Sequence, residues 1–251
     1  MADVRRPRGT GLAAAFRAAA VDFYYQSIRL VPANLLWGLA FLAWLVVTVS
    51  TGPLVTLATA PLVAVPWVGV VRLAALTARG QDVVLSDVGT AIRRFGLVAL
   101  ASGAVLALAV AILASNAYLG ASLGGPVGWG LTTLSLTGLV SLWVLSWPYW
   151  VLLVDPERED LPLRSRARLA ALLVVAAPGR LAWLSLLLAV LLLVSTVAFV
   201  AVLTIAPAYA ALVSARYCLP LSDRLERWLD GRGERDGRDA GAPTRGRGND
   251  G

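Results

Sequence analysis

The fold is decided between residues 34 and 96, which read NLLWGLAFLAWLVVTVSTGPLVTLATAPLVAVPWVGVVRLAALTARGQDVVLSDVGTAIRRFG. An uncharged apolar run is followed by a turn at Gly52-Pro53, and a second apolar run continues to Thr77. A charged connector then leads to Arg93-Arg94-Phe95. About 20 apolar residues are enough to cross the hydrocarbon core of a bilayer. The order therefore predicts two membrane-spanning helices joined by a tight turn, and a connector that stays at one membrane surface.

The composition of the whole chain agrees with this reading. Hydrophobic residues make up 58% of the 251 positions and charged residues only 15%, whereas soluble domains carry roughly 25% charged residues. Because such a chain could not cover its surface in water, we predict an all-α fold, a polytopic helical membrane bundle. Histidine is absent and Cys218 is the single cysteine. The sequence thus offers no catalytic, cofactor-binding or metal site, and we expect a protein that is not an enzyme and needs no cofactor.

Six transmembrane helices are predicted in a membrane domain from residue 30 to residue 219. The expected spans are 30–51, 53–77, 96–119, 127–154, 181–198 and 200–219. The last two divide an uncharged stretch from Leu181 to Ala215, which as one helix would measure about 52 Å against a hydrocarbon core of about 30 Å. A single crossing of this stretch gives the alternative of five spans.

The segments outside the spans are basic or highly charged. Residues 1–29 are predicted to form a basic cytoplasmic arm whose helix, at 12–28, lies on the membrane surface. Residues 86–95 and 163–177 are expected to form short interfacial helices on the cytoplasmic side. Residues 220–251 are expected to form a charged, largely disordered cytoplasmic tail.

The distribution of charge predicts the topology. The turns near Gly52, at 120–130 and at 195–201 contain no charged residue, and every Arg, Asp and Glu lies in the arm, the connectors, the inner end of span two or the tail. Arg-rich loops mark the cytoplasmic side of a membrane. We therefore expect a multi-pass protein of the cell membrane with both termini cytoplasmic.

Two stripes of side chains predict how spans three and four pack. Small residues recur every fourth position around Gly103, and the hydroxyl side chains of Thr133, Thr137 and Ser141 recur at the same spacing in span four. Small residues let helices approach closely within a membrane. We expect these two stripes to face each other. For Asn34 we expect a role in packing, with an interhelical hydrogen bond or a contact to a ligand as the alternatives.

Several short motifs resemble those of the YesL-like family of bacterial membrane proteins. They are Asn34-Leu35-Leu36-Trp37, the proline-rich second span, Arg79-Gly80, Arg93-Arg94-Phe95, and more weakly Pro148 and Asp155. The resemblance covers about residues 15–220; it departs from the family at Gln81, where an acid is usual, and in lacking Lys. It implies a small helical membrane protein of no established activity, often encoded near carbohydrate-uptake genes.

Two functional classes follow for this protein. The first is an accessory or scaffold component of a membrane complex, possibly linked to carbohydrate uptake, and the second is a small permease or channel-like carrier. The lack of ionisable groups at depth favours the first. The expected partners are the lipid bilayer, anionic lipid headgroups met by Arg79, Arg93 and Arg94, and a transporter or other membrane protein. Nucleic acid is not expected, because the Arg-Gly tail is nearly neutral.

Overall fold

The computed structural model describes residues 11–198, 201 and 204–240, with the main chain alone from 230. Every regular element in this part of the chain is helical, which confirms the all-α fold. The elements are α1 (Leu12–Ser50), α2 (Pro53–Thr59), η1 (Ala60–Val63), α3 (Ala64–Arg79), α4 (Ser86–Leu123), α5 (Gly125–Leu153), η2 (Pro156–Arg158), α6 (Leu163–Ala176), α7 (Pro178–Val197) and α9 (Ala206–Ala240).

Five helical stretches among the described residues are long and apolar enough to cross a membrane. They are α1, the continuous α2–η1–α3 stretch, α4, α5 and α7. The protein is therefore a multi-pass membrane protein. The sixth predicted span falls partly on residues 200 and 202–203, which lie outside the described residues; its described part is the beginning of α9.

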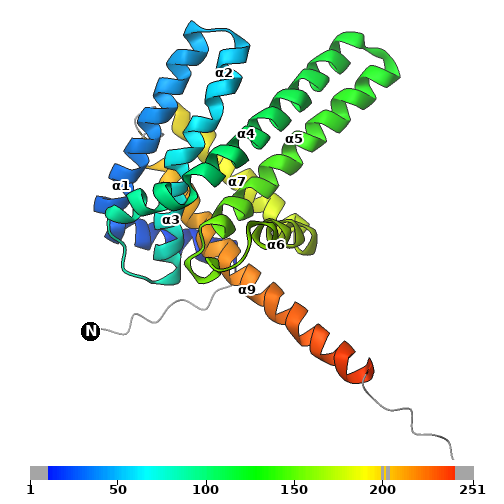
Figure 1. Cartoon of the computed structure of the whole chain (residues 1–251). Coiled ribbons are helices and arrows are strands. Elements are labelled where there is room, and N and C mark those ends of the chain that lie inside the picture. Colours follow the sequence, from blue (N-terminus) through cyan, green and yellow to red (C-terminus); the bar gives the residue numbers. More distant parts are fainter. Residues whose placement is uncertain (1–10, 199–200, 202–203, 241–251) are drawn as a thin grey trace, which may run out of the picture.

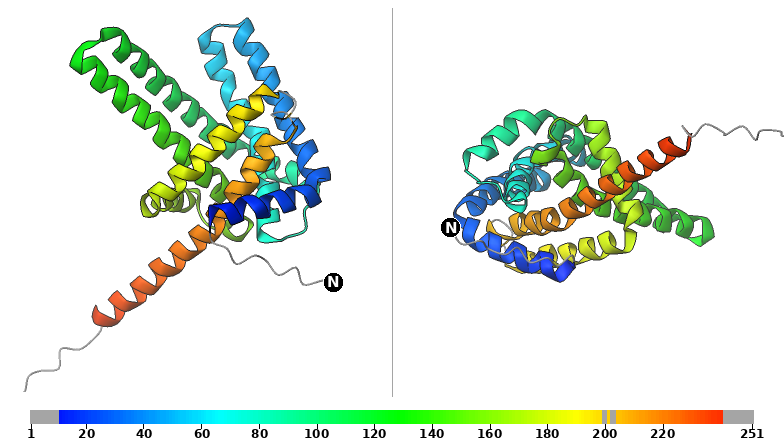
Figure 2. Two further views of the ribbon diagram at one scale, coloured as in Figure 1. Left: turned by 180° about the vertical axis from the view of Figure 1, so that it is seen from behind. Right: turned by 90° about the horizontal axis from the view of Figure 1, so that it is seen from below.

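Two long helical hairpins dominate the architecture (Figure 1). One is made by α1 with α2–η1–α3, the other by α4 with α5, and they diverge away from the end at which α6 and α9 lie. Figure 2 shows α7 and the first part of α9 behind them, running in opposite directions. The second half of α9 extends away from the bundle, and α1 begins at this same end (Figure 2). We call this end, which carries the charged connectors, the charged face.

The tightest packing is near the charged face and is centred on α9. Its residues 210–215, which read AALVSA, are all buried, and so are 73–77 of α3. Alanine side chains let the neighbouring helices come close, which is the main source of packing energy where lipid supplies no hydrophobic drive between helices. The first half of α9 is therefore the central helix of the bundle.

The basic arm is not a separate surface helix. α1 runs without interruption through the predicted arm helix and span one, with Pro32 inside it, and Figure 2 shows it bending between its first part and its ascending part. Proline removes one backbone hydrogen bond and bends a helix. The aromatic rings of Phe16 and Phe23 pack on Tyr209, with centroids 6.3 and 6.2 Å away. The arm helix thus rests on α9 and is not the separate helix on the membrane surface that we had expected.

Two other expected boundaries are wrong. The predicted interfacial helix at 86–95 is the first part of α4, which continues to Leu123. The single breaker at the junction is Gly96, which costs only about 1 kcal/mol in a helix interior. The predicted tail is helical as far as Ala240, since α9 does not stop at Leu219; residues 241–251 lie outside the described part. The second connector helix agrees with expectation, because α6 covers Leu163–Ala176.

The two stripes do not face each other. Gly103 of α4 faces η1 and α3: a Cβ at this position would lie 2.9 Å from Cβ of Ala64 and 3.3 Å from Cα of Pro61. Thr133, Thr137 and Ser141 are exposed on α5. The hydroxyls of Thr137 and Ser141 donate to backbone carbonyls four residues earlier, each at 2.8 Å. A hydroxyl satisfied within its own helix can face lipid, which is why the spacing was misleading.

Other residues join α4 to α5. Near the hairpin tip the two backbones touch at Gly120 and Gly128, where a Cβ on either residue would collide with the other helix. Nearer the charged face the hydroxyls of Ser102 and Tyr149 are hydrogen-bonded at 2.5 Å.

Gly103 offers the first test of this packing. Gly103→Leu should lower the stability of the folded bundle by about 1–3 kcal/mol, the usual cost of overpacking, because Ala64 and the backbone of Pro61 leave no room. Melting temperature in mild detergent is the measurement. Gly130→Leu is the matched control, since a Cβ at Gly130 meets nothing within 4 Å. An equal effect of the two substitutions would contradict the assigned contact.

Candidate functional site

A completely buried carboxylate, Asp155, lies at the charged face directly after α5. Its oxygens accept two hydrogen bonds from Arg79 at the end of α3, from Nε at 3.1 Å and from Nη2 at 2.7 Å. Arg158 of η2 donates to the same carboxylate. Asp155 also caps η2 by accepting from the backbone N–H of Glu157 at 3.3 Å. Its position is therefore fixed from both sides.

Two carboxylates of α9 complete the group. Asp223 accepts from Arg79 Nη1 at 2.7 Å and from Arg158 Nη2 at 2.6 Å. Glu226 accepts from Arg158 Nε at 3.1 Å and Nη2 at 2.5 Å. We call Arg79, Asp155, Arg158, Asp223 and Glu226 the Asp155 cluster. It joins the end of α3, the α5–α6 connection and α9, three segments that lie far apart in the sequence.

The opposite charges of the cluster stabilise one another. Burial alone would lower the pKa of Arg158, but its hydrogen bonds with Glu226 and Asp223 and the charge of Asp155 raise it overall. Burial would raise the pKa of Asp223, but hydrogen bonds from Arg79 and Arg158 lower it overall. Arg158 and Asp223 are therefore held in their charged forms, and the arrangement is typical of a structural ion-pair network.

Two further arginines, Arg166 and Arg72, donate hydrogen bonds to backbone carbonyl oxygens at and just after the end of α5. Arg166 of α6 is buried and donates to the carbonyl oxygens of Leu161 at 3.0 Å and Glu159 at 2.6 Å, and also to that of Leu153. Arg72 donates to the carbonyl oxygen of Val154 at 2.7 Å. Helix carbonyls at a C-terminus lack partners within their helix and carry partial negative charge. These guanidinium groups satisfy them.

The three arginines expected to meet lipid phosphates differ in their surroundings. Arg79 is turned into the protein, with a side chain only 10% exposed and three carboxylates around it, so it does not fit that role. Arg94 pairs with Glu159 and is half exposed. Arg93 is exposed and makes no ion pair within the described residues, so among the three it alone has a free guanidinium.

Between the two hairpins lies an apolar groove of about 780 Å³, which we call the hairpin groove. Its aromatic wall joins three elements: Trp37 of α1 lies 5.7 Å from Trp67 of α3, and Trp67 lies 6.2 Å from Trp147 of α5, centroid to centroid. The lining also includes Gly103, Ala107 and Ala111 of α4. Among the described residues, no charged side chain lines it.

The remaining candidate residues, Asn34 and Pro148, are buried within their helices' packing contacts. Asn34 is fully buried on α1, one turn before Trp37. Pro148 is buried within α5 beside Trp147. The indole N–H of Trp147 is enclosed and has no acceptor within the described part of the chain, so ring packing alone fixes this side chain. Sequence reasoning placed Trp37 and Asp155 among candidate residues but did not foresee the Trp wall or the partners of Asp155.

In the described part of the chain, no three side chains of His, Cys, Asp or Glu come together in an arrangement that could hold a metal ion. No protein-family model, curated protein or solved structure matches this chain. The Asp155 cluster and the hairpin groove are therefore considered first as functional candidates within the described residues.

Removing the central carboxylate tests the role of the Asp155 cluster. Asp155→Ala should cost about 3–5 kcal/mol of stability, because Arg79 and Arg158 would keep buried charges without their shared partner. Thermal unfolding in detergent measures the loss. Glu157→Ala is the control: Glu157 pairs with Arg79 at 2.9 Å but its side chain is 55% exposed, so its loss should be small. Similar losses for the two variants would contradict the importance of burial.

The lowered pKa of Asp223 gives a dependence on pH. A carboxylate with a folded pKa below its unfolded value of about 3.9 stabilises the fold above that value, and this contribution is lost as the pH falls through the folded pKa. Asp223→Asn should therefore melt below the wild type at pH 7, and the difference should shrink below about pH 4. Asp160→Asn, an exposed position outside any ion pair of the described part, should melt like the wild type throughout. A constant difference for Asp223→Asn would contradict the pairing.

Proposed function

We propose that this protein is an accessory or scaffold component of a membrane complex, and that its hairpin groove receives an apolar transmembrane helix of a partner protein. The observation that carries the proposal is the groove itself, an uncharged hollow between hairpins of membrane-spanning length. A hollow at this depth is filled by something apolar, because hydrocarbon offers no water to fill it.

The lining favours a helix as the occupant over lipid chains. Small side chains stand on both hairpins, at Ala60 of η1 and at Ala107 and Ala111 of α4, and such residues allow a helix backbone to approach closely. The facing Trp rings are held by one another, and the indole N–H groups of Trp44 and Trp143 are already bonded to backbone carbonyls, each at 3.1 Å. The walls are thus rigid and complementary to a ridge of apolar side chains.

The same lining disfavours the permease or channel-like alternative. A sugar or an ion needs polar or ionisable partners along its path. Among the described residues, the groove supplies side-chain hydroxyls only at Thr56 and Ser146. We accordingly propose a non-enzymatic, non-transporting role. Substrate flux in liposomes that contain this protein alone would favour the permease instead.

Site-specific photocrosslinking in cells tests the partner helix. A photoreactive amino acid at Ala107 or Ala111 should form an adduct with one discrete membrane protein, because these side chains line the groove. Ala104 and Ala114 lie exposed on the same helix outside the groove and serve as controls. Adducts of one mass at 107 and 111 but not at 104 and 114 support the proposal. Equal adducts at all four positions, adducts only with a second copy of this chain, or no protein adduct would contradict it.

The family assignment is also a proposal. The motif at residues 34–37, Arg79-Gly80 and Arg93-Arg94-Phe95 support membership in the bacterial YesL-like family. If the chain belongs there, a transporter for carbohydrate uptake is the first partner to look for among crosslinked proteins.

We further propose six spans in the cell membrane with both termini cytoplasmic. The chain reverses between α7 and α9 (Figure 2), and the hairpin tips carry no charge while the arginines gather at the charged face. Arginine-rich segments stay on the cytoplasmic side, so the charged face is assigned to the cytoplasm.

Cysteine labelling checks this topology. In a Cys218→Ser background, a cysteine at Ser122 should react with an impermeant thiol reagent on intact cells, and one at Asn249 should not. Ser122 is exposed at the tip of the α4–α5 hairpin, opposite the charged face (Figure 1). Reaction at both positions would support five spans, and reaction at 249 alone would invert the assignment.

A further inference from the structure

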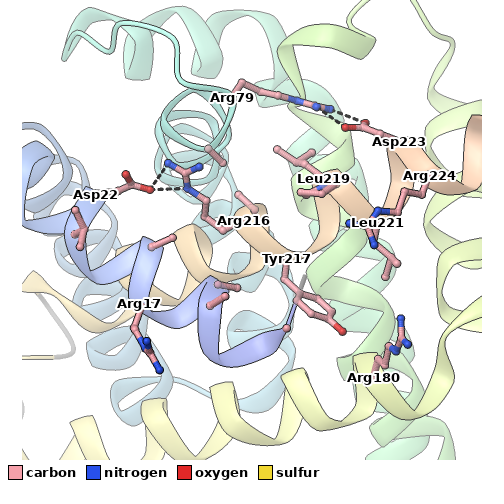
Figure 3. A pocket seen from close by; sticks show the side chains of 18 of the residues that line it. Arg17, Asp22, Arg79, Arg180, Arg216, Tyr217, Leu219, Leu221, Asp223 and Arg224 are labelled. Carbon is pink, nitrogen blue, oxygen red and sulfur yellow. Dashed lines mark hydrogen bonds and ion pairs between the residues drawn. The ribbon is translucent and has the colours of Figure 1, made fainter. Parts of the chain in front are cut away.

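A second hollow, of about 760 Å³, lies at the charged face, and we call it the arginine cavity (Figure 3). Its walls come from the first turns of α1, the end of α3, the start of α7 and the middle of α9. Eight charged side chains line it: Arg17, Asp22, Arg79, Glu157, Arg180, Arg216, Asp223 and Arg224. Five of them are positive and three are negative.

The three carboxylates are already used by two of the arginines. Asp22 pairs with Arg216, which donates from Nε at 2.5 Å. Asp223 and Glu157 pair with Arg79, at 2.7 and 2.9 Å. Figure 3 shows the pair of Asp22 with Arg216 and the pair of Asp223 with Arg79. The acids therefore neutralise only part of the positive charge around this hollow.

Three arginines remain around the cavity without a carboxylate. Arg17 of α1, Arg180 of α7 and Arg224 of α9 form no hydrogen bond or ion pair within the described residues. Figure 3 shows Tyr217 projecting from α9 between Arg17 and Arg180. Figure 3 also shows Arg180 and Arg224 on the same side of Tyr217, with Arg17 on the other side. An anion bound in this hollow would offset positive charge that no carboxylate of the described residues there balances.

The rest of the lining is apolar. It includes Ala14, Ala18 and Val21 of α1 and Leu219 and Leu221 of α9. The first part of α1, which supplies one wall, crosses the base of the bundle (Figure 2). An anion that also carries an apolar portion would satisfy both kinds of lining.

We infer that the arginine cavity binds one phosphate-bearing anion at Arg180 and Arg224, with Arg17 adding positive charge from the other side of Tyr217. Guanidinium groups bind phosphate oxygens with two parallel N–H donors, which gives strength and geometry. The apolar wall favours an anionic phospholipid headgroup with its glycerol portion over a small soluble phosphate, and both sources share the phosphate chemistry. This inference is independent of the partner helix, because the arginine cavity and the hairpin groove share no lining residue among those described.

A pair of triple variants separates a specific cavity from general basicity. Arg17, Arg180 and Arg224 are changed to Gln in one variant. Arg93, Arg164 and Arg168, which are exposed at the charged face outside the cavity, are changed to Gln in the other. Both variants lose three positive charges. Binding of dihexanoyl phosphatidic acid to the purified full chain in detergent is measured by titration calorimetry, with dihexanoyl phosphatidylcholine, glycerol phosphate and inorganic phosphate as further probes.

The wild type should bind phosphatidic acid saturably at one site. The cavity variant should bind at least about tenfold more weakly, as expected for loss of several arginines at a phosphate, and the control variant less than about twofold. Weak binding of glycerol phosphate would assign the lipid as ligand, and equal binding of both would assign a soluble organic phosphate. Equal weakening in the two triple variants, or no saturable binding by the wild type, would overturn the inference.

Further variants separate a loss of binding from a loss of folding. The corresponding Arg→Lys triple keeps the charges and should retain most of the binding. If the Gln triple does not fold, Arg180→Gln and Arg224→Gln are tested singly against Arg168→Gln, and each should weaken binding by at least about threefold. Single cavity variants that bind like Arg168→Gln would overturn the inference.

Discussion

The structure depends on one buried carboxylate, that of Asp155, held between Arg79 and Arg158. A chain of this composition cannot place charge in hydrocarbon, so its ionised groups gather at the ends of its helices. Some of them are covered there by other helices, and a covered charge needs partners. The partners of Asp155 come from α3 and η2, and those of Arg158 come also from α9. Satisfying one charge therefore positions the end of α3, the short helix η2 and the middle of α9.

This constraint acts at one end only, and the shape of the bundle follows from it. At the charged face, ion pairs and the alanines of α9 bring the helices together. At the other end no charge requires a partner, and each hairpin is held mainly by its own contacts, such as Gly120 against Gly128. The two hairpins can then diverge, as Figure 1 shows, and the hairpin groove is the space between them. The open groove and the closed cluster thus have one physical origin.

The sequence was sufficient to predict the features that the membrane imposes, and insufficient to predict which helices contact each other. The all-α membrane fold follows from apolar length, and the clustering of charge predicted which segments share a face. The direction of Gly103 could not be read from its spacing, because both α3 and α5 were available as neighbours. The spacing of Thr133, Thr137 and Ser141 carried no information on partners, since their hydroxyls can bond within the helix. Asp155 was noticed as a candidate. The arginines that connect it to Asp223 and Glu226 bond to these two residues across 65 or more positions of the chain, which no local pattern reveals. A useful signal was the place of Asp155 directly after an uncharged span.

The hairpin of α7 and α9 relates the two candidate binding regions. Leu192 and Pro207, near its turn, line the hairpin groove, while Arg180 and Tyr217, near its base, line the arginine cavity. The same two helices thus form part of both walls, at opposite ends of the hairpin. α9 is also fixed to α3 and η2 through Asp223, so any shift of this hairpin must strain the Asp155 cluster. An occupant of the groove that leaves the cluster intact must therefore fit between the hairpins without displacing α9.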